Sequence, residues 1–117
     1  ISSIVSTTGV AFETHYGAAK GGIDGLVRSL SREVASRGVS VNAIRPGYFD
    51  TPLSAMIPDE ELRLLQECIA VGRFGRPDEV GALAVYLASD EAEYMTGELF
   101  GPNGGFSYGH ADLDALS

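Results

Sequence analysis

The longest regular pattern in this chain is a run of apolar residues at helical spacing between about Thr14 and Ser36. Repeats of three and four residues place such side chains on one face of a helix. The positions that follow this spacing are Ala19, Ile23, Leu26, Val27, Leu30 and Val34. Short apolar segments lie on both sides of the run, at residues 1–5 and at Val39–Ile44. A strand, a long helix and a second strand in that order predict a parallel pair joined by a helical crossover.

The rest of the chain continues this alternation. A second helix is expected from Asp59 to Val71, because acidic residues fill its first turn. A third should start at Pro77 and end near Ser89, and a last strand should cover Glu98–Gly101. The order predicts an α/β fold with a Rossmann-like, doubly wound parallel sheet. Three strands make about half of such a sheet, so we expect residues 1–117 to be the C-terminal half of one domain.

Composition excludes several classes of protein. The chain has 117 residues, of which 44% are hydrophobic and 21% charged, as in a single globular domain. Its formal charge is −8 and its basic residues are scattered, which argues against a nucleic-acid partner. No apolar run approaches the roughly 18 residues of a membrane span. We therefore expect a cytoplasmic protein without a membrane segment. Cys68 is the only cysteine, so neither an internal disulfide nor a cysteine-based metal site is predicted.

Two segments have a less regular pattern. Residues 48–58 should form a loop carrying apolar side chains, and such a loop is a candidate lid over a small-molecule site. Those side chains are Phe49, Leu53, Met56 and Ile57. After the turn at residues 102–105, a tail with His110 runs to Ser117. His15 precedes Tyr16 and is expected on another helix face, as a substrate-loop or surface residue.

Tyr16 and Lys20 are the first candidates for chemistry. Four residues apart in a predicted helix, they project from one face and can converge on one point. A phenol ionises near pH 10 in water, and a nearby ammonium stabilises the phenolate and brings it toward the range useful for proton transfer. The pattern alone also fits a solvent-facing lysine beside an interfacial tyrosine. Ser3, thirteen positions before Tyr16 at the end of a predicted strand, could hydrogen-bond a substrate oxygen.

Several segments together resemble the classical short-chain dehydrogenases and reductases. Residues 1–3 look like the strand with the family's catalytic serine, residues 16–20 like its Tyr-x-x-x-Lys motif, and residues 41–47 like the strand and turn that follow. Residues 72–80, 87–90 and 96–97 are similar to later stretches of the family. The resemblance covers nearly the whole chain and is strongest to reductases of the 3-oxoacyl-carrier-protein type.

The resemblance implies an oxidoreductase that moves a hydride between NAD or NADP and an alcohol or ketone. Tyr16 would be the general acid or base, Lys20 would assist it and bind the nicotinamide ribose, and Ser3 would orient the substrate oxygen. Pro46 and Gly47 would pass along the nicotinamide ring, with Thr51 near its carboxamide or a phosphate. It also implies a homo-oligomer, a dimer or a tetramer, and no metal.

This chain also departs from the family pattern. The Gly-rich phosphate loop and the Asn-Asn-Ala-Gly segment are absent, and Gly21, Gly22 and Gly25 cannot replace the loop because they lie inside a predicted helix. Preference for NAD or NADP is therefore not encoded in these residues. An alternative is a catalytically inert fragment or degenerate homologue that serves in assembly. The glycines of the long helix would suit that role, since they allow another backbone to approach closely.

Overall fold

The computed structural model describes residues 1–106, so His110 and the rest of the tail from residue 107 lie outside the described part. In chain order, its elements are α1 (Val5–Thr8), α2 (Thr14–Val34), the 3₁₀ turn η1 (Ala35–Arg37), β1 (Ala43–Ile44), η2 (Ser54–Met56), α3 (Asp59–Glu67), α4 (Pro77–Leu87), η3 (Asp90–Ala92) and β2 (Leu99–Phe100). No helix within residues 1–106 is both long and apolar enough to cross a membrane.

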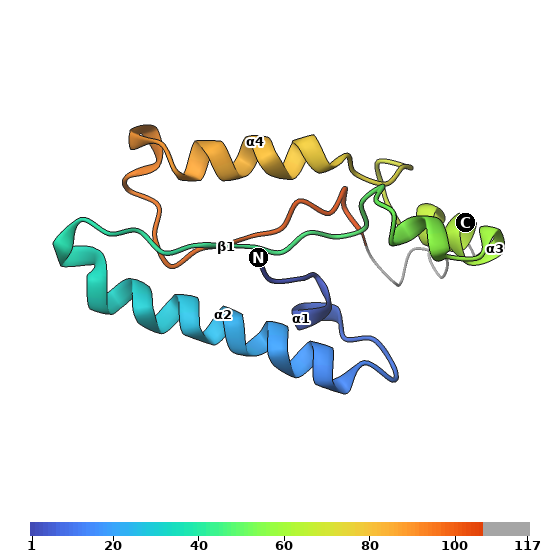
Figure 1. The fold of residues 1–117 in the computed structure, drawn as a ribbon, viewed down its shortest axis with the longest axis horizontal. Coiled ribbons are helices and arrows are strands. Elements are labelled where there is room, and N and C mark those ends of the chain that lie inside the picture. Colours follow the sequence, from blue (N-terminus) through green and yellow to red (C-terminus); the bar gives the residue numbers. More distant parts are fainter. Residues whose placement is uncertain (107–117) are drawn as a thin grey trace, which may run out of the picture.

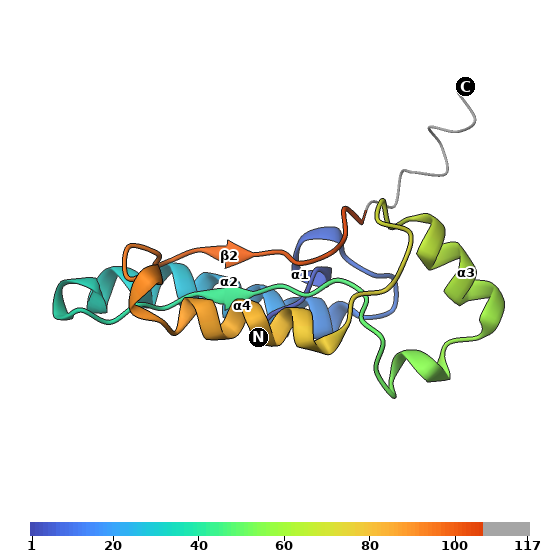
Figure 2. The same cartoon turned by 90° about the horizontal axis from the view of Figure 1, so that it is seen from above.

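The strands lie between two layers of helix. Figure 1 shows α4 along one face of the β1–β2 pair and α2, with α1, along the other. The pairing is parallel, with Ala43 opposite Leu99 and Ile44 opposite Phe100. In both Figure 1 and Figure 2, α3 stands at one end of the molecule, beyond the two long helices. The predicted α/β alternation with parallel strands is confirmed in this form.

The segment from Ala43 to Gly47 forms backbone hydrogen bonds with a neighbouring segment on each side. On one side, alternate N–H groups of this segment donate to the chain around β2: Ala43 to Glu98, Arg45 to Phe100 and Gly47 to Pro102, at 2.9, 2.7 and 3.0 Å. On the other side, two of its carbonyls accept from the start of the chain: Ile44 from Ser2 at 2.8 Å and Pro46 from Ile4 at 3.0 Å. Residues 1–4 therefore lie beside β1, as predicted.

Residues 1–5 do not form the predicted strand, however, and α1 (Val5–Thr8) takes up the last residue of that strand and the start of the loop expected after it. In a parallel pair of strands, backbone N–H groups of both strands donate to carbonyls of the other strand, alternately along the pair. Pro46 has no N–H, so it cannot donate to the Ser2 carbonyl. Gly9, with φ of 69°, then ends α1.

The second strand is also shorter than the predicted Val39–Ile44. At Val41 and Asn42, side-chain hydrogen bonds accompany a single backbone bond, from Gly97 N–H to the Val41 carbonyl at 2.8 Å. Val41 N–H donates to Thr96 Oγ1 at 3.0 Å, and the Asn42 amide donates to the Met95 carbonyl at 2.9 Å. The Asn42 side-chain oxygen accepts from Glu98 N–H at 3.1 Å. These contacts fix the entry to β1 without extending the strand.

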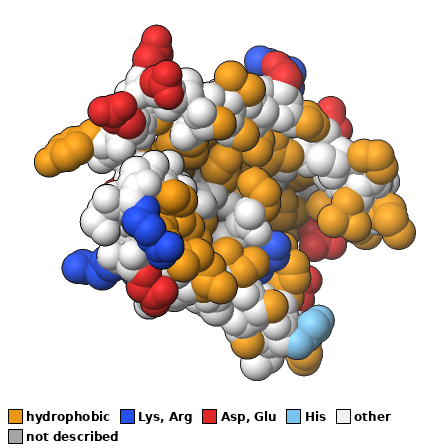
Figure 3. Space-filling view, turned by 60° about the vertical axis from the view of Figure 1, so that its left-hand side comes forward, with side chains coloured by type: hydrophobic (Ala, Val, Ile, Leu, Met, Phe, Trp, Pro, Cys, Tyr) orange, Lys and Arg blue, Asp and Glu red, His pale blue; other side chains and the backbone are white. Residues whose placement is uncertain are grey.

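The second predicted helix, Asp59–Val71, ends at Glu67 because the residues after it belong to the core. Ile69, Phe74 and Phe106 form a buried cluster, with Cys68 packed against it. The Val71 N–H donates to the Gly104 carbonyl at 3.0 Å. Phe106, predicted as the start of the tail, is thus a core residue. Figure 3 shows many other apolar side chains along the hollowed middle of one face.

Candidate active site

Tyr16 and Lys20 lie on one face of α2, as their spacing predicts. The Nζ atom of Lys20 lies 5.6 Å from the centroid of the Tyr16 ring, a distance at which an ammonium and an aromatic face attract each other. Tyr16 is exposed and Lys20 is half-buried. The helix thus holds a phenol that solutes can reach beside the chain's single lysine.

Lys20 is also fastened to the start of the chain. Its Nζ atom donates to the Ile1 carbonyl at 3.1 Å, and the Ser2 hydroxyl donates to the Lys20 carbonyl at 3.2 Å. Ser2 is only 3% exposed, so this second bond lies inside the molecule. No role for Ser2 was predictable, because a serine beside another serine carries no signal of a bond to residue 20. The contact fixes residues 1–3 against the turn of α2 that carries Lys20.

Ser3, the predicted substrate-orienting residue, is buried and bonds to the first residue of α1. Its Oγ atom accepts a hydrogen bond from the Val5 N–H at 3.2 Å, and its carbonyl accepts one from the Ser6 hydroxyl at 2.8 Å. A hydroxyl that accepts one bond can still donate its own proton. Ser3 directly follows Ile1 and Ser2, the two residues that bond to Lys20.

Pro46 and Gly47 lie next to this segment, and Thr51 lies apart from it. The Pro46 carbonyl bonds to Ile4, and Gly47 is pressed against Asn103, where a Cβ atom on Gly47 would lie 2.9 Å from the Asn103 Cα. Thr51 belongs to the turn of η2: its N–H donates to Ser54 Oγ at 2.9 Å. The contacts within residues 1–106 therefore connect Pro46 with the start of the chain and leave Thr51 in its own turn.

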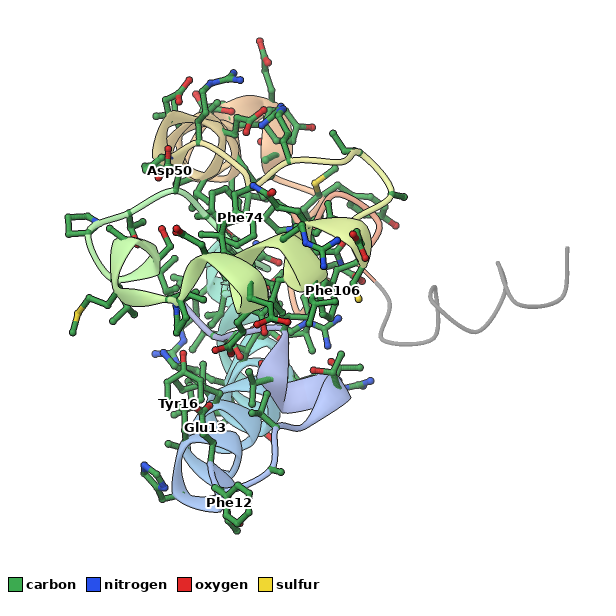
Figure 4. All side chains as sticks on the ribbon, turned by 90° about the vertical axis from the view of Figure 1, so that its right-hand side faces the viewer. Phe12, Glu13, Tyr16, Asp50, Phe74 and Phe106 are labelled. Atoms are coloured by element: carbon green, nitrogen blue, oxygen red, sulfur yellow. The ribbon has the colours of Figure 1, made fainter. Side chains whose placement is uncertain are left out.

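The loop ahead of Tyr16 and the loop after Gly47 both carry exposed apolar side chains. Phe12 is fully exposed and has a left-handed φ of 67°. Figure 4 shows Phe12, Glu13 and Tyr16 together at the start of α2, apart from Phe74. Leu53 and Met56 are 77% and 79% exposed, as expected for the predicted lid segment, whereas Phe49 and Ile57 are half-buried.

Two cavities lie beside Arg73 rather than beside Tyr16. The larger, of about 380 Å³, has Asp50, Ser54, Gln66 and Arg76 among its lining residues, and the smaller, of about 180 Å³, lies next to Phe49 and Asn103. Tyr16 and Lys20 line neither of these cavities. Within residues 1–106, no group of three or more His, Cys, Asp or Glu side chains could hold a metal ion.

The ion pair at the start of α4 is the main electrostatic feature away from Tyr16. Arg73 donates to both carboxylate oxygens of Glu79, at 2.8 and 3.1 Å, and the Arg76 N–H donates to the same carboxylate at 2.7 Å. The Arg73 hydrogen bonds first, and then the Arg76 N–H, lower the pKa of Glu79 from 4.5 to about 2. Residues 73–79, within the stretch that resembles the family, thus stabilise the start of α4.

Comparison with known proteins identifies the family. A family model described as enoyl-(acyl carrier protein) reductase matches residues 1–107. The chain is 43% identical over 105 residues to the 3-oxoacyl-[acyl-carrier-protein] reductase FabG of Vibrio harveyi, and 38% identical over 105 residues to that of Thermotoga maritima; each match covers 90% of this chain and 43% of the relative. Nodulation protein G of Azospirillum brasilense is 42% identical over 108 residues, 92% of this chain and 44% of that protein.

The chain belongs to the short-chain dehydrogenase/reductase family. The resemblance to 3-oxoacyl-carrier-protein reductases, drawn from the motifs, is confirmed by relatives at about 40% identity over most of the chain. The chain spans 43–44% of the length of the relatives described here.

Proposed function

We propose that residues 1–117 form the C-terminal part of a single dinucleotide-binding domain, in an oxidoreductase that interconverts an alcohol and a ketone with NAD or NADP. The observation that carries this proposal is the position of Lys20, whose ammonium lies over the Tyr16 ring and is tied to Ile1. Membership of the family and the parallel crossover from β1 to β2 support it. The doubly wound sheet of about three strands is part of the same proposal.

In the proposed reaction, the phenol oxygen of Tyr16 gives a proton to a ketone during reduction and takes one from an alcohol during oxidation. The nearby Lys20 ammonium stabilises the negative charge on that oxygen. The Ser3 hydroxyl donates to the substrate oxygen and holds it toward Tyr16. A bound nicotinamide dinucleotide would supply or accept the hydride.

The residues present fit the nicotinamide end of such a dinucleotide. An ammonium has three N–H donors, and one acceptor of Lys20 is the Ile1 carbonyl. Its remaining donors can hold ribose hydroxyls, with Tyr16 beside them. Pro46, Gly47 and Thr51 complete the proposed nicotinamide site. The diphosphate end needs a glycine-rich turn between a strand and a helix, and Gly21, Gly22 and Gly25 all lie within α2.

The substrate class we propose is a ketone with apolar bulk. The family description names an enoyl reductase and the relatives are named 3-oxoacyl reductases, so the names differ in the bond that is reduced, C=C or C=O. A proton donor and a hydroxyl aimed at one oxygen suit a carbonyl. The exposed Leu53 and Met56 offer apolar surface on the loop that follows Gly47.

The test is the variant Tyr16→Phe in the protein as its gene encodes it. Tyr86→Phe on α4 is a matched control, since both tyrosines are 38% exposed. General acid–base catalysis contributes roughly 10²–10⁴-fold, so Tyr16→Phe should lose at least about 100-fold of NAD(P)H-linked turnover of 3-oxoacyl thioesters, with dinucleotide affinity roughly retained. Tyr86→Phe should match the wild type. Turnover preserved in Tyr16→Phe would exclude the proposed role, and reduction of enoyl thioesters alone would exclude the ketone.

A second candidate, a catalytically inert module for assembly, is favoured by the glycines of α2. Gly17, Gly21, Gly22 and Gly25 have open space where a Cβ atom would be, which leaves room for another backbone to approach. The catalytic proposal also includes a homo-oligomer, a dimer or tetramer, in the cytoplasm. Wild-type protein that associates in analytical ultracentrifugation but shows no turnover would favour the inert module.

A further inference from the structure

Asp24 is a buried residue whose carboxylate has an oxygen atom without a hydrogen-bond partner in the described part of the chain. It is 5% exposed, and its Oδ1 atom accepts no hydrogen bond within residues 1–106. Aspartate is almost never fully buried unless it is paired, because removing a charge or an unbonded polar atom from water is costly. An aspartate kept at such a position needs a compensating interaction.

Asp24 continues the face of α2 that carries Tyr16 and Lys20. The three residues follow one another at intervals of four, which places them in a row along the helix. Asp24 is therefore one turn beyond Lys20, about 6 Å along the axis. The Ser2 hydroxyl donates to the Lys20 carbonyl at 3.2 Å, so the start of the chain is bonded to α2 one turn before Asp24.

Lys20 is likewise a charge without an opposite partner. Its ammonium bonds to the Ile1 carbonyl, and none of the ion pairs formed within residues 1–106 includes Lys20 or Asp24. Of the other charged groups near this face, Arg28 is exposed one turn after Asp24, and Arg45, which follows β1, donates to Thr7 at 2.6 Å. The α1 segment, VSTT, has no charged side chain. Asp24 and Lys20 thus lie one helical turn apart, and neither takes part in an ion pair within residues 1–106.

We propose that Asp24 is a positioning residue that acts through Lys20: its carboxylate, buried one helical turn beyond Lys20, offsets part of the effect of the ammonium on Tyr16. The inference rests on the proposed proton transfer at Tyr16. A fixed negative charge behind Lys20 offsets part of the positive potential at the phenol. Removing that charge makes the phenolate form at lower pH, because an unopposed cation stabilises it more strongly.

The experiment compares the pH dependence of alcohol oxidation in the wild type, Asp24→Asn and Glu33→Gln. Unit charges about 10 Å apart at an effective dielectric constant of about 20 shift a titration by roughly one pH unit, before screening. We expect the pH of half-maximal kcat/KM to fall by about half to one unit in Asp24→Asn. Glu33→Gln removes the same charge from an exposed position of α2, about 20 Å from Lys20 along the helix, and should leave the profile unchanged.

The variants separate a charge effect from a structural one. Asp24→Glu keeps the charge and should keep the wild-type profile. Where Asp24→Asn does not fold, Asp24→Ser replaces it, because a serine hydroxyl can bond to the carbonyl one turn back. A profile in either neutral variant that superimposes on the wild type overturns the proposal, whatever happens to the melting temperature. Two other results would contradict the proposed function itself: wild-type protein without turnover, or a fully active Tyr16→Phe variant.

Discussion

Substitution of Gly47 tests how tightly the predicted nicotinamide segment is packed. A Cβ atom there would lie 2.9 Å from both the Cα and the Cβ of Asn103. The Cα atom is backbone and cannot swing aside, and the Gly47 N–H bond to Pro102 at 3.0 Å holds the two segments together. Overpacking of this kind costs about 1–3 kcal/mol. Each kcal/mol corresponds to about 2–8 °C in melting temperature for domains between 60 and 250 residues, so Gly47→Ala should melt at least about 2 °C below the wild type.

The assay is thermal and urea unfolding followed by circular dichroism without dinucleotide, so that only packing is measured. Gly81→Ala is the control: Gly81 lies inside α4, and a Cβ atom there meets nothing within 4 Å. Alanine in a helix interior should stabilise the protein by up to about 1 kcal/mol. The two substitutions add the same methyl group and should act in opposite directions. A Gly47→Ala variant as stable as the wild type would refute the packing argument.

Three further predictions concern stability. Arg73 and a backbone N–H lower the pKa of Glu79 from 4.5 to about 2. The ionised carboxylate therefore adds its full contribution to the free energy of unfolding above pH 4.5, and this contribution is lost as the pH falls through about 2. Glu79→Gln should therefore unfold in less urea than the wild type near neutral pH and match it near pH 2. Phe74→Ala removes a buried core ring and should cost about 3 kcal/mol in urea unfolding. Gly97→Ala should cost about 1–2 kcal/mol in the same measurement, because φ at Gly97 is 74°.

The long helices could be predicted because their signals are local. Apolar spacing predicted a helix from about Thr14 to Ser36, which agrees with α2 to within two residues, and Pro77 marked the start of α4. The positions of the strands along the chain could be predicted, but their first and last residues could not. Their ends depend on partners more than fifty residues away, such as Thr96 for Val41, and on the missing N–H of Pro46. The early end of α3 has the same kind of cause, since Ile69 is drawn into a core with Phe106.

For the site, the spacing of Tyr16 and Lys20 was sufficient to predict that they are neighbours, because a helix fixes that geometry. The bond from Ser2 to the Lys20 carbonyl was not predictable, since it joins residues eighteen positions apart. The burial of Asp24 was hidden for a similar reason. A polar residue between Ile23 and Gly25 fits a solvent-facing position, and only its packing in the folded chain leaves it 5% exposed.

The hydrogen bonds around Ala43–Gly47 also determine where this protein can change in length. Two neighbouring segments are bonded to alternate residues of the same five-residue stretch. Deleting one residue there would shift the register with both neighbouring segments. The side chains beyond the deletion would then point to the opposite face of the sheet. Substitutions in this stretch affect one contact, whereas a single insertion or deletion would affect every one of them. Length differences among related sequences should therefore fall outside it, in the loop before α3.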